Sequence, residues 1–565
     1  MRQDGQVTPR AGATQIVDTA DVRKARGAFF TPEPLARYVT EWTVRQRSDS
    51  VLEPSCGEAA FLLAAAARQA SLADGVVQAG PLDGIELHSE SAAAATDLLT
   101  AAGAHPRIAV GDFFLNEPEP RYDAVIGNPP YVRYQDFSGE ARNRSRQAAL
   151  RAGVSLTNLA SSWAAFTIHS ALFLKPGGRL GLVLPAELLS VNYAAEVRRY
   201  LMQRFARVRL VLFTKRVFPG VLEEVVLLLA EGVGPTDHCE LLQVHDIDDL
   251  WTVDAGREST WTPTTSSGKW TSALIPAVAT DAYQALVTGP AFTTLNTWGD
   301  TTLGMVTGNN KYFTVSPDEA RRLKIPAAEL LTLSPPGSRH LRKLSFTTQM
   351  RNELGGQGAA TLLFRPAGDP SPAARKYIAH GKRLKVDEAY KCRVRTPWWR
   401  VPLVPVADLL LTYMNADTPR LTTNTAGALH LNSVHGVYLR DETKNIGRRL
   451  LPLASLNSAT LLGAETVGRS YGGGMLKLEP SEADILPMPT LAQVEAASDA
   501  LTKIRESVRA RLKDGRLMDA VRLVDAALLI DTIGVDRHTV ILLEEAHAVL
   551  TARRLSRGTA AKAQA

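Results

Sequence analysis

The chain has 565 residues, of which 45% are hydrophobic and 22% charged, so about two or three globular domains of ordinary composition are expected. The net charge of +6 weakly favours a polyanionic partner, and the three scattered cysteines (Cys56, Cys239 and Cys392) show no metal-ligand spacing and suit a reducing compartment. No apolar run has the length of a membrane span and the polar amino terminus is unlike a signal peptide, which excludes a membrane partner and predicts a cytoplasmic protein.

Residues 1–26 are polar, lack hydrophobic periodicity and end in a basic cluster, so we expect a flexible basic arm. The segment Gly27-Ala28-Phe29-Phe30-Thr31-Pro32 follows, and apolar residues then recur at helical spacing. Thr31 fits the N-cap of this helix and Pro32 its first position. Taken alone, the segment predicts no more than a capped helix.

The run from Val51 to Leu62 is typical of a buried strand, a tight loop and an Ala-rich helix. Loops between a parallel strand and the amino terminus of a helix are ligand sites in doubly wound folds. Gly57 would let the loop backbone approach a ligand closely, and Glu53 would place a carboxylate near a cationic group.

Two further strands are predicted, each with an acidic residue near its carboxyl end. Glu86 lies in the strand at 82–87, one βαβ unit after the glycine loop, where an acidic side chain suits the diol of a ribose. Asp112 and Phe113 lie in the strand at 108–114, and they suit an exocyclic amine and a purine ring.

The next strand, at 122–126, runs into Gly127-Asn128-Pro129-Pro130-Tyr131. The two prolines hold the backbone rigid and extended. Asn128 and the Pro129 carbonyl then offer two converging acceptors, and Tyr131 a flat aromatic face, for a planar amino group. Asn-Pro also occurs in simple capped turns, but three acidic strand ends before it make coincidence the poorer explanation.

These motifs, in this order, resemble the gamma class of adenine-N6 DNA methyltransferases, the modification enzymes of restriction–modification systems. The resemblance rests on Gly27-Ala28-Phe29-Phe30-Thr31-Pro32, Glu53-Pro54-Ser55-Cys56-Gly57, Gly84-Ile85-Glu86, Gly111-Asp112-Phe113 and Asn128-Pro129-Pro130-Tyr131. It implies a class I fold that binds S-adenosyl-L-methionine (SAM), an α/β doubly wound sheet, here over residues 27–235. Family members often have a second glycine where Ala59 stands, and alanine suits the same loop if its φ is negative.

The resemblance also assigns roles to residues on both sides of the reaction. The cofactor would be held by Thr31 and Glu53 at its methionine end, Gly57 in the loop, Glu86 at the ribose, and Asp112 with Phe113 at the adenine. The catalytic corner would comprise Asn128, Pro129, Pro130 and Tyr131, with Phe218 of a Val-Phe-Pro segment packing on the target base. Phe218 is equally compatible with a core position at a strand edge.

From residue 236 the alternation of strands and helices fades, and we expect a mixed α+β DNA target-recognition domain over 236–490. A basic stretch between Arg339 and Arg400 contains few acidic residues and lies beside Trp398 and Trp399, which suits a phosphate backbone. Residues 491–565 show helical periodicity with mixed charge and predict a helical carboxyl-terminal segment.

The chemistry expected of this site is direct methyl transfer to an amine. Acceptance of both adenine N6 hydrogens by Asn128 Oδ1 and the Pro129 carbonyl would aim the nitrogen lone pair at the SAM methyl group, without a metal or an enzyme nucleophile. The adenine must leave the duplex to be reached, so Tyr131 and Phe218 would sandwich it.

Several alternatives share parts of this pattern. Protein-glutamine N5 methyltransferases also use Asn-Pro-Pro-Tyr, but they resemble the first half alone. Cytosine-N4 enzymes more often have serine where Asn128 stands, and cytosine-C5 enzymes need a Pro-Cys nucleophile that is absent here. A DNA-binding specificity subunit with an inactive SAM fold is the non-enzymatic alternative.

The expected partner is double-stranded DNA. The Phe-Thr-Pro segment begins near the amino terminus, and no Pro-Asp…Glu-x-Lys constellation stands out. We therefore expect modification without cleavage, with any cognate restriction nuclease encoded separately. The protein is expected to be a monomer associated with the bacterial nucleoid.

Overall fold

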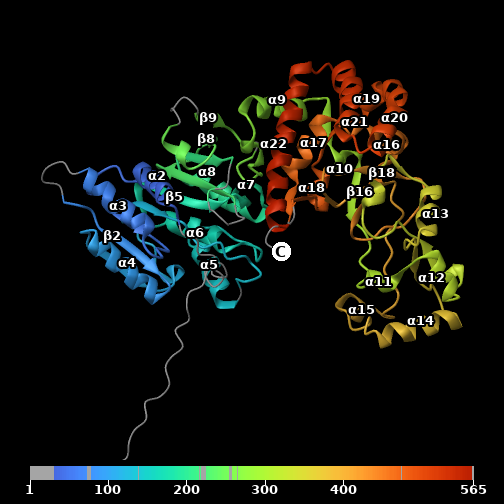
Figure 1. Cartoon of the computed structure of the whole chain (residues 1–565), viewed down its shortest axis with the longest axis horizontal. Coiled ribbons are helices and arrows are strands. Elements are labelled where there is room, and N and C mark those ends of the chain that lie inside the picture. The colour runs from blue at the N-terminus through green and yellow to red at the C-terminus, as the bar shows by residue number, and fades with distance from the viewer. Residues whose placement is uncertain are drawn as a thin grey trace, which may run out of the picture. The chain divides into compact units, whose positions relative to one another are not determined.

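The computed structural model describes residues 31–72, 78–137, 139–214, 217, 224–252, 258–263, 265–471 and 474–562. The chain forms two compact units, Met1–Trp270 and Thr271–Ala565 (Figure 1). Among the helices described, none combines the length and apolar character that crossing a bilayer requires.

The first unit is built on a nine-stranded sheet with strand order β3-β2-β1-β4-β5-β7-β6-β8-β9. The first five strands in this order run parallel, whereas β7 is antiparallel to both of its neighbours. The strands are β1 (Val51–Glu53), β2 (Leu82–Glu86), β3 (Pro106–Val110), β4 (Tyr122–Gly127), β5 (Leu174–Pro185), β6 (Arg207–Phe213), β7 (Val225–Glu231), β8 (Cys239–Val244) and β9 (Glu258–Trp261). The reversal of strand order between β1 and β4 confirms the predicted doubly wound fold.

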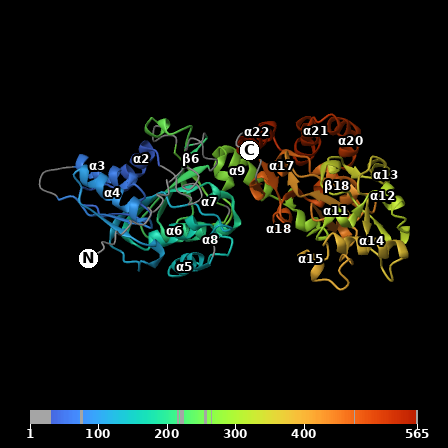
Figure 2. The ribbon, with the colours of Figure 1, turned by 60° about the horizontal axis from the view of Figure 1, so that its bottom comes forward.

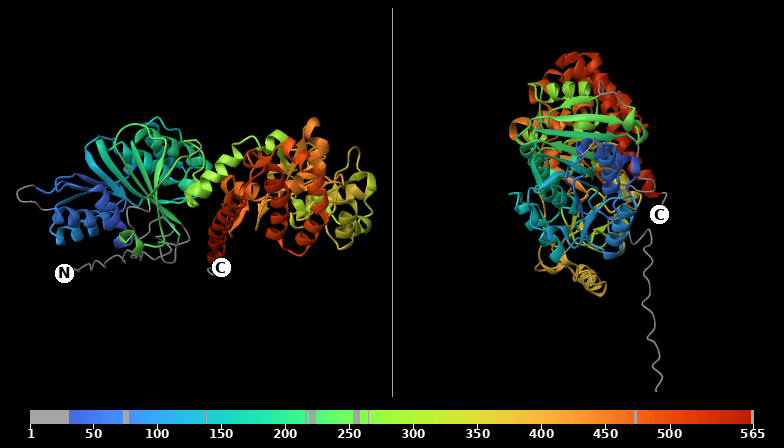
Figure 3. Two further views of the ribbon diagram at one scale, coloured as in Figure 1. Left: turned by 90° about the horizontal axis from the view of Figure 1, so that it is seen from above. Right: turned by 90° about the vertical axis from the view of Figure 1, so that its left-hand side faces the viewer.

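Helices cover both faces of this sheet (Figure 3). Helices α2, α3 and α4 pack side by side, and α6 packs against α5, α8 and strand β5. Their bounds are α2 (Glu33–Thr43), α3 (Ala60–Ser71), α4 (Ser89–Ala101), α5 (Gly139–Leu150), α6 (Ser162–Ala171) and α8 (Ala195–Arg204). The middle parts of the central strands are therefore apolar, and Ile126, Leu182 and Leu228 are fully or almost fully buried.

Three details of the first unit differ from the sequence-based expectation. Helix α2 begins at Glu33 with Pro32 as its N-cap, and Thr31 makes no capping bond. Strand β3 ends at Val110, and Asp112 caps a short 3₁₀ helix, η1 (Phe113–Leu115). The sheet also continues past residue 235, because β8 pairs with β6 and β9 pairs with β8 without a helix between them.

The second unit contains a five-stranded sheet, two three-stranded sheets and a two-stranded sheet among many helices. The strand order of the largest sheet is β11-β19-β16-β18-β14. Its strands are β11 (Gly299–Leu303), β14 (Ser345–Phe346), β16 (Leu409–Thr412), β18 (Leu421–Asn424) and β19 (Val434–Leu439). The smaller sheets are formed by β10 (Phe292–Thr294) with β22 (Pro487–Pro489), by β12 (Thr314–Val315), β15 (Leu362–Phe364) and β13 (Leu330–Thr332), and by β17 (Met414–Asn415), β21 (Met475–Lys477) and β20 (Arg469–Tyr471).

Helices make up much of the rest of the second unit, with α20 and α21 at one edge of it and α14 and α15 at the opposite edge (Figure 2). They are α9 (Ala277–Val287), α10 (Leu295–Trp298), α11 (Asn310–Phe313), α12 (Pro317–Arg322), α13 (Thr348–Gly356), α14 (Pro372–Arg383), α15 (Tyr390–Arg393), α16 (Asp441–Ala454), α17 (Ser458–Val467), α18 (Pro480–Asp484), α19 (Leu491–Ala496), α20 (Ser498–Lys513), α21 (Leu517–Val524) and α22 (Arg537–Lys562). One apolar core runs from Leu295 to Leu528 and joins the large sheet to α16, α20 and α21. The carboxyl-terminal helices and the sheet therefore form one folded body.

A buried ion pair fastens the last helix to this body. Arg554 of α22 donates to Glu465 of α17 (Nη2 to Oε1, 2.7 Å), and the two side chains are 3% and 4% exposed. The same guanidinium donates to the carbonyl oxygens of Ala416, Asp417 and Gly474. One side chain thus satisfies acceptors from three separate segments.

We expect Arg554→Met to destabilise the protein by about 3–5 kcal/mol, because Glu465 would be left buried without its cationic partner. Urea unfolding followed by circular dichroism measures this difference. Arg522→Met is the matched control: Arg522 pairs with Glu544 at the surface and is 59% exposed, so a loss of at most about 1 kcal/mol is expected. Equal effects of the two substitutions would contradict the structural role of Arg554.

Candidate active site

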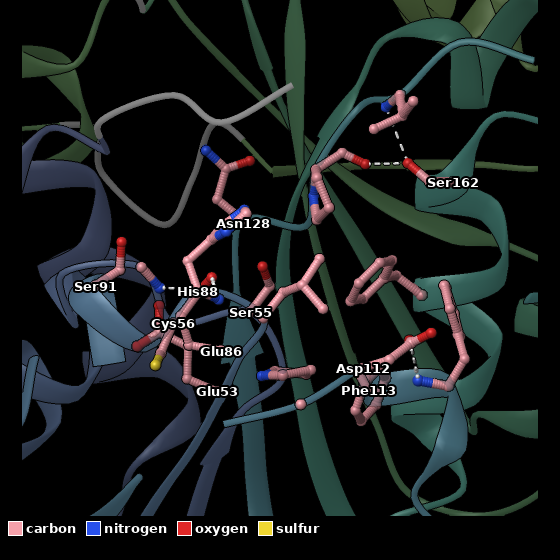
Figure 4. Close-up of a pocket in the computed structure, with 18 of the residues that line it drawn as sticks. Glu53, Ser55, Cys56, Glu86, His88, Ser91, Asp112, Phe113, Asn128 and Ser162 are labelled. Atoms are coloured by element: carbon pink, nitrogen blue, oxygen red, sulfur yellow. Dashed lines mark hydrogen bonds between the residues drawn. The ribbon is translucent and has the colours of Figure 1, made fainter. Parts of the chain in front are cut away.

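A cavity of about 460 Å³ opens at the carboxyl ends of β1, β2 and β4 in the first unit (Figure 4). Its volume is typical of small-molecule sites, roughly 300–1,000 Å³. It lies where the strand order of the parallel sheet reverses, the usual ligand position in doubly wound folds. Eight of the predicted site residues line it: Thr31, Glu53, Gly57, Glu86, Asp112, Phe113, Asn128 and Pro130.

The loop between β1 and α3 is tied to Glu86 at the end of β2. The Gly57 amide donates to Glu86 Oε2 (2.9 Å), and the His88 amide donates to Glu86 Oε1 (3.0 Å). Ala59 has a φ of 64°, so the negative φ that alanine would favour there is not found. An alanine in this left-handed region costs roughly 1–2 kcal/mol, and the surrounding bonds must hold the loop against that strain.

Glu53 ends strand β1, and its side chain is almost completely buried. Its Oε2 accepts a hydrogen bond from the Leu62 amide in the first turn of α3 (3.1 Å). Burial, with a smaller contribution from the Glu86 carboxylate, raises the pKa of Glu53 well above its ordinary value. A cationic ligand group beside Glu53 would favour the ionised form that burial disfavours.

Asp112 and Phe113 form another side of the cavity (Figure 4). Asp112 Oδ1 accepts from the Phe114 amide (3.0 Å), and Arg144 of α5 approaches Asp112 Oδ2 at 3.4 Å. Phe113 is 3% exposed, and its ring stacks on Phe166 of α6 with 5.4 Å between the ring centroids. This pair of rings gives the cavity an apolar surface next to a carboxylate.

Asn128 follows β4 directly and lines the cavity. Both the nitrogen and the oxygen of its side-chain amide are hydrogen-bonded to neighbouring side chains. Asn128 Nδ2 donates to Thr31 Oγ1 (3.3 Å), and the Tyr131 hydroxyl donates to Asn128 Oδ1 (2.7 Å). The same hydroxyl lies 3.0 Å from the Val183 carbonyl oxygen, so its single hydrogen is shared between two acceptors. These contacts orient the Asn128 amide before any substrate arrives.

The backbone at Pro130 and Val132 is held by a helix that begins about 30 residues later in the sequence. Ser162, at the start of α6, donates from Oγ to the Pro130 carbonyl and accepts from the Val132 amide (2.9 Å). Pro129 is buried at the corner, and Tyr131 is 9% exposed, with its hydroxyl engaged as described. Phe218 lies outside the described residues, so its predicted packing on the target base stays a prediction.

The cavity also contains residues that the sequence analysis did not single out. Ser55 lies within a recognised motif without an assigned role, and His88 and Ser91 follow the motif that contains Glu86, so their proximity in sequence was an available signal. Phe137, Ser162 and Phe166 belong to the region of α5 and α6, whose apolar pattern does not distinguish cavity positions from core positions.

Comparison with known proteins agrees with this architecture. Residues 16–256 match the family model for N-6 DNA Methylase. Residues 267–529 match the model for the C-terminal domain of Type II methyltransferase M.Eco57I. The change from one model to the other falls close to the boundary between the two compact units.

Individual relatives are similar over most of the chain. The chain is 23% identical to Type II methyltransferase M.AccI of Acinetobacter calcoaceticus over 509 residues, covering 88% of this chain and 92% of that protein. It is 26% identical to Type II methyltransferase M.XamI of Xanthomonas campestris pv. amaranthicola over 505 residues, covering 86% and 90%. Among solved structures, the type IIG restriction endonuclease BpuSI matches with a TM-score of 0.44 and 13% identity, over 96% of this chain and 67% of that one.

The doubly wound sheet, the cavity at its switch point and the matches over both units lead to one conclusion. The chain is a DNA methyltransferase of the N-6 DNA methylase type found in restriction–modification systems, and its cofactor is S-adenosyl-L-methionine.

Proposed function

We propose that the enzyme transfers the SAM methyl group to N6 of an adenine that has been turned out of duplex DNA. The supporting observation is the convergence of Glu53, Glu86, Asp112 and Asn128 on one cavity, although they lie far apart in sequence. Asn128, the acceptor for the target amine, and the three carboxylates that would bind the cofactor therefore line the same cavity.

The residues that would hold SAM fit its chemistry. Glu53 would receive the cationic methionine end, because a buried carboxyl gains most from a positive neighbour. Glu86 would take the ribose hydroxyls, since each of its oxygens keeps acceptor capacity beyond its bond to a loop amide. Asp112 and Phe113 would contact the adenine amine and ring. Bound SAM supplies the electrophilic methyl group.

Asn128 would act on the target amine, whose lone pair is delocalised into the adenine ring. Asn128 Oδ1 and the Pro129 carbonyl would accept its two hydrogens and direct the lone pair towards the methyl donor. A carboxamide oxygen has two lone pairs, so Oδ1 can accept from Tyr131 and from the amine together. The bonds to Thr31 and Tyr131 make this a preorganised acceptor, which is how positioning accelerates such a displacement.

The second unit would supply recognition of the DNA sequence, as its match to a methyltransferase C-terminal domain suggests. The protein would modify DNA without cutting it and would act as a monomer on nucleoid DNA in the bacterial cytoplasm, beside a separately encoded nuclease. Within the described residues no cluster of three or more His, Cys, Asp or Glu side chains is placed to hold a metal ion.

We expect Asn128→Ala to reduce methyl transfer to DNA by at least about a hundredfold while SAM affinity changes by no more than a few-fold, because a lost acceptor acts mainly in the transition state. Transfer of tritiated methyl groups and calorimetric SAM titration measure the two quantities. Digestion of the product to nucleosides identifies the base: N6-methyladenine supports the proposal, and N4-methylcytosine contradicts it. Loss of SAM binding in Asn128→Ala would instead place this residue in the cofactor site.

We expect the affinity for SAM to rise with pH as Glu53 ionises, because the cationic ligand binds the carboxylate form and binding therefore releases a proton. The folded-state pKa of Glu53 is raised, so this gain falls above the ordinary titration range of a glutamate. Glu53→Gln is the matched variant, and it should bind SAM more weakly and lack this part of the pH dependence. Parallel pH profiles of the two proteins would contradict a contact between Glu53 and the cofactor.

We expect the purified chain with Mg²⁺ to leave unmethylated plasmid DNA intact, because modification and cleavage are assigned to separate proteins. Agarose gel analysis after prolonged incubation, with and without SAM, is the measurement. Linear or nicked product that increases with enzyme concentration would overturn this assignment.

A further inference from the structure

Most of the cations between Arg339 and Arg400 fall into two groups, and the exposed Arg339 and Lys343 lie outside both. Five arginines are engaged inside the protein: Arg342 pairs with Asp417, Arg351 donates to Thr332, Arg365 to Val401, Arg395 to Val306 and Thr307, and Arg400 to Ala367. Their donors hold loops together. These side chains are therefore poor candidates for contacts with a partner.

The second group is exposed and concentrated in one short region. It comprises Arg375, Lys376, Lys382, Arg383, Lys385, Lys391 and Arg393. Within the described residues, none of these seven has an ion-pair partner within 4 Å. The span 372–394 contains only two acidic residues, Asp387 and Glu388. This surface is strongly positive and uncompensated.

Large apolar side chains protrude from the same surface. Leu384, Tyr390 and Val394 are 58%, 65% and 62% exposed. Val394 directly follows α15 and lies one turn after Tyr390, since the Val394 amide donates to the Tyr390 carbonyl, and so the two side chains are neighbours. The Lys391 ammonium lies 5.6 Å from the centre of the Tyr390 ring.

The exposed residues belong to a well-anchored segment. Arg395 donates to the carbonyl oxygens of Thr307 (2.7 Å) and Val306 (2.6 Å), and the Cys392 thiol lies 3.6 Å from the Thr307 carbonyl oxygen. Val386 and Cys392 are buried in the apolar core under α11 to α15. Figures 1 and 2 show α14 and α15 at the edge of the second unit opposite α20 and α21. The apolar side chains are thus presented outward by a fixed support.

We propose that residues 382–394, the α14–α15 tip, enter a groove of the substrate DNA. Tyr390 and Val394 contact the bases, and the surrounding lysines and arginines contact the flanking phosphates. The proposal rests on DNA being the substrate. Apolar side chains wedged against base steps within a cationic surround are a recurrent means of gripping deformed DNA, and aromatic stacking on bases adds sequence-tolerant affinity. A protein partner fits less well, because the centres of protein interfaces are depleted in lysine.

Binding of a duplex that the wild-type enzyme methylates, measured by fluorescence anisotropy over a range of salt concentrations, separates the two kinds of contact. Tyr390→Ala should weaken binding by roughly five- to a hundredfold, as base stacking does, with an unchanged salt slope. Lys382→Ala with Lys385→Ala should lower the slope of log affinity against log salt by about two. Tyr390→Phe should bind like the wild type.

The matched controls lie in the same unit away from the tip. Ile541→Ala removes an apolar side chain that is 52% exposed, and Lys503→Ala with Lys513→Ala removes two exposed cations of α20. Neither should change affinity or salt slope. A photoreactive benzoylphenylalanine at position 390 should also crosslink to the duplex, which tests contact without relying on a loss of affinity.

Wild-type affinity and salt slope in both tip variants, or crosslinking at position 390 to protein and never to DNA, would overturn the proposal. Failure of the proposed function looks different, because the wild-type enzyme itself would then transfer no methyl group to DNA. SAM titration of Tyr390→Ala, expected to match the wild type, shows that the first unit is intact in the variant.

Discussion

The bonds of the Glu86 carboxylate to the Gly57 and His88 amides are the constraint on which the site depends. They join the loop after β1 to the loop after β2, and so they define two walls of the cavity at once. The loop after β1 contains Ala59 at a φ of 64°, a conformation that an isolated chain would avoid. Because Glu86 is buried at the end of a parallel strand, the sheet itself positions the carboxylate that stabilises the loop.

The Asn-Pro-Pro-Tyr corner is likewise held in place by residues from other parts of the chain. The prolines restrict its backbone, but the orientation of the Asn128 amide comes from Thr31 and Tyr131, and the Pro130 carbonyl is held by Ser162. The contributing residues lie before β1, within the corner and at the start of α6. The acceptor for the substrate amine is therefore rigid through tertiary contacts, which is the condition for electrostatic preorganisation.

The strands and the acidic residues at their ends could be predicted because both follow from local pattern: a buried run, a break, and a polar side chain at the break. The left-handed Ala59 could not, since alanine by itself favours a negative φ and the other value occurs in a loop that is tied to β2 by tertiary hydrogen bonds. Ser162 gave no signal because its partner Pro130 is 32 residues away. The extension of the sheet by β8 and β9 was missed because these strands follow without intervening helices, so the alternating pattern that marked the domain had already ended.

The second unit shows why charge alone identifies a partner poorly. Arg393 and Arg395 look equivalent in sequence. However, the Arg395 guanidinium donates hydrogen bonds to two loop carbonyls, whereas Arg393 is exposed. An arginine that is hydrogen-bonded to loops contributes to the shape of a surface. An exposed arginine without an acidic partner contributes to the positive electrostatic potential of that surface. Once the internally bonded arginines are set aside, most of the remaining cations lie on α14, α15 and the loop between them, the segment that also carries Tyr390 and Val394. A phosphate backbone with base edges beside it is the polyanion whose chemistry matches both the charge and the exposed apolar side chains of that surface.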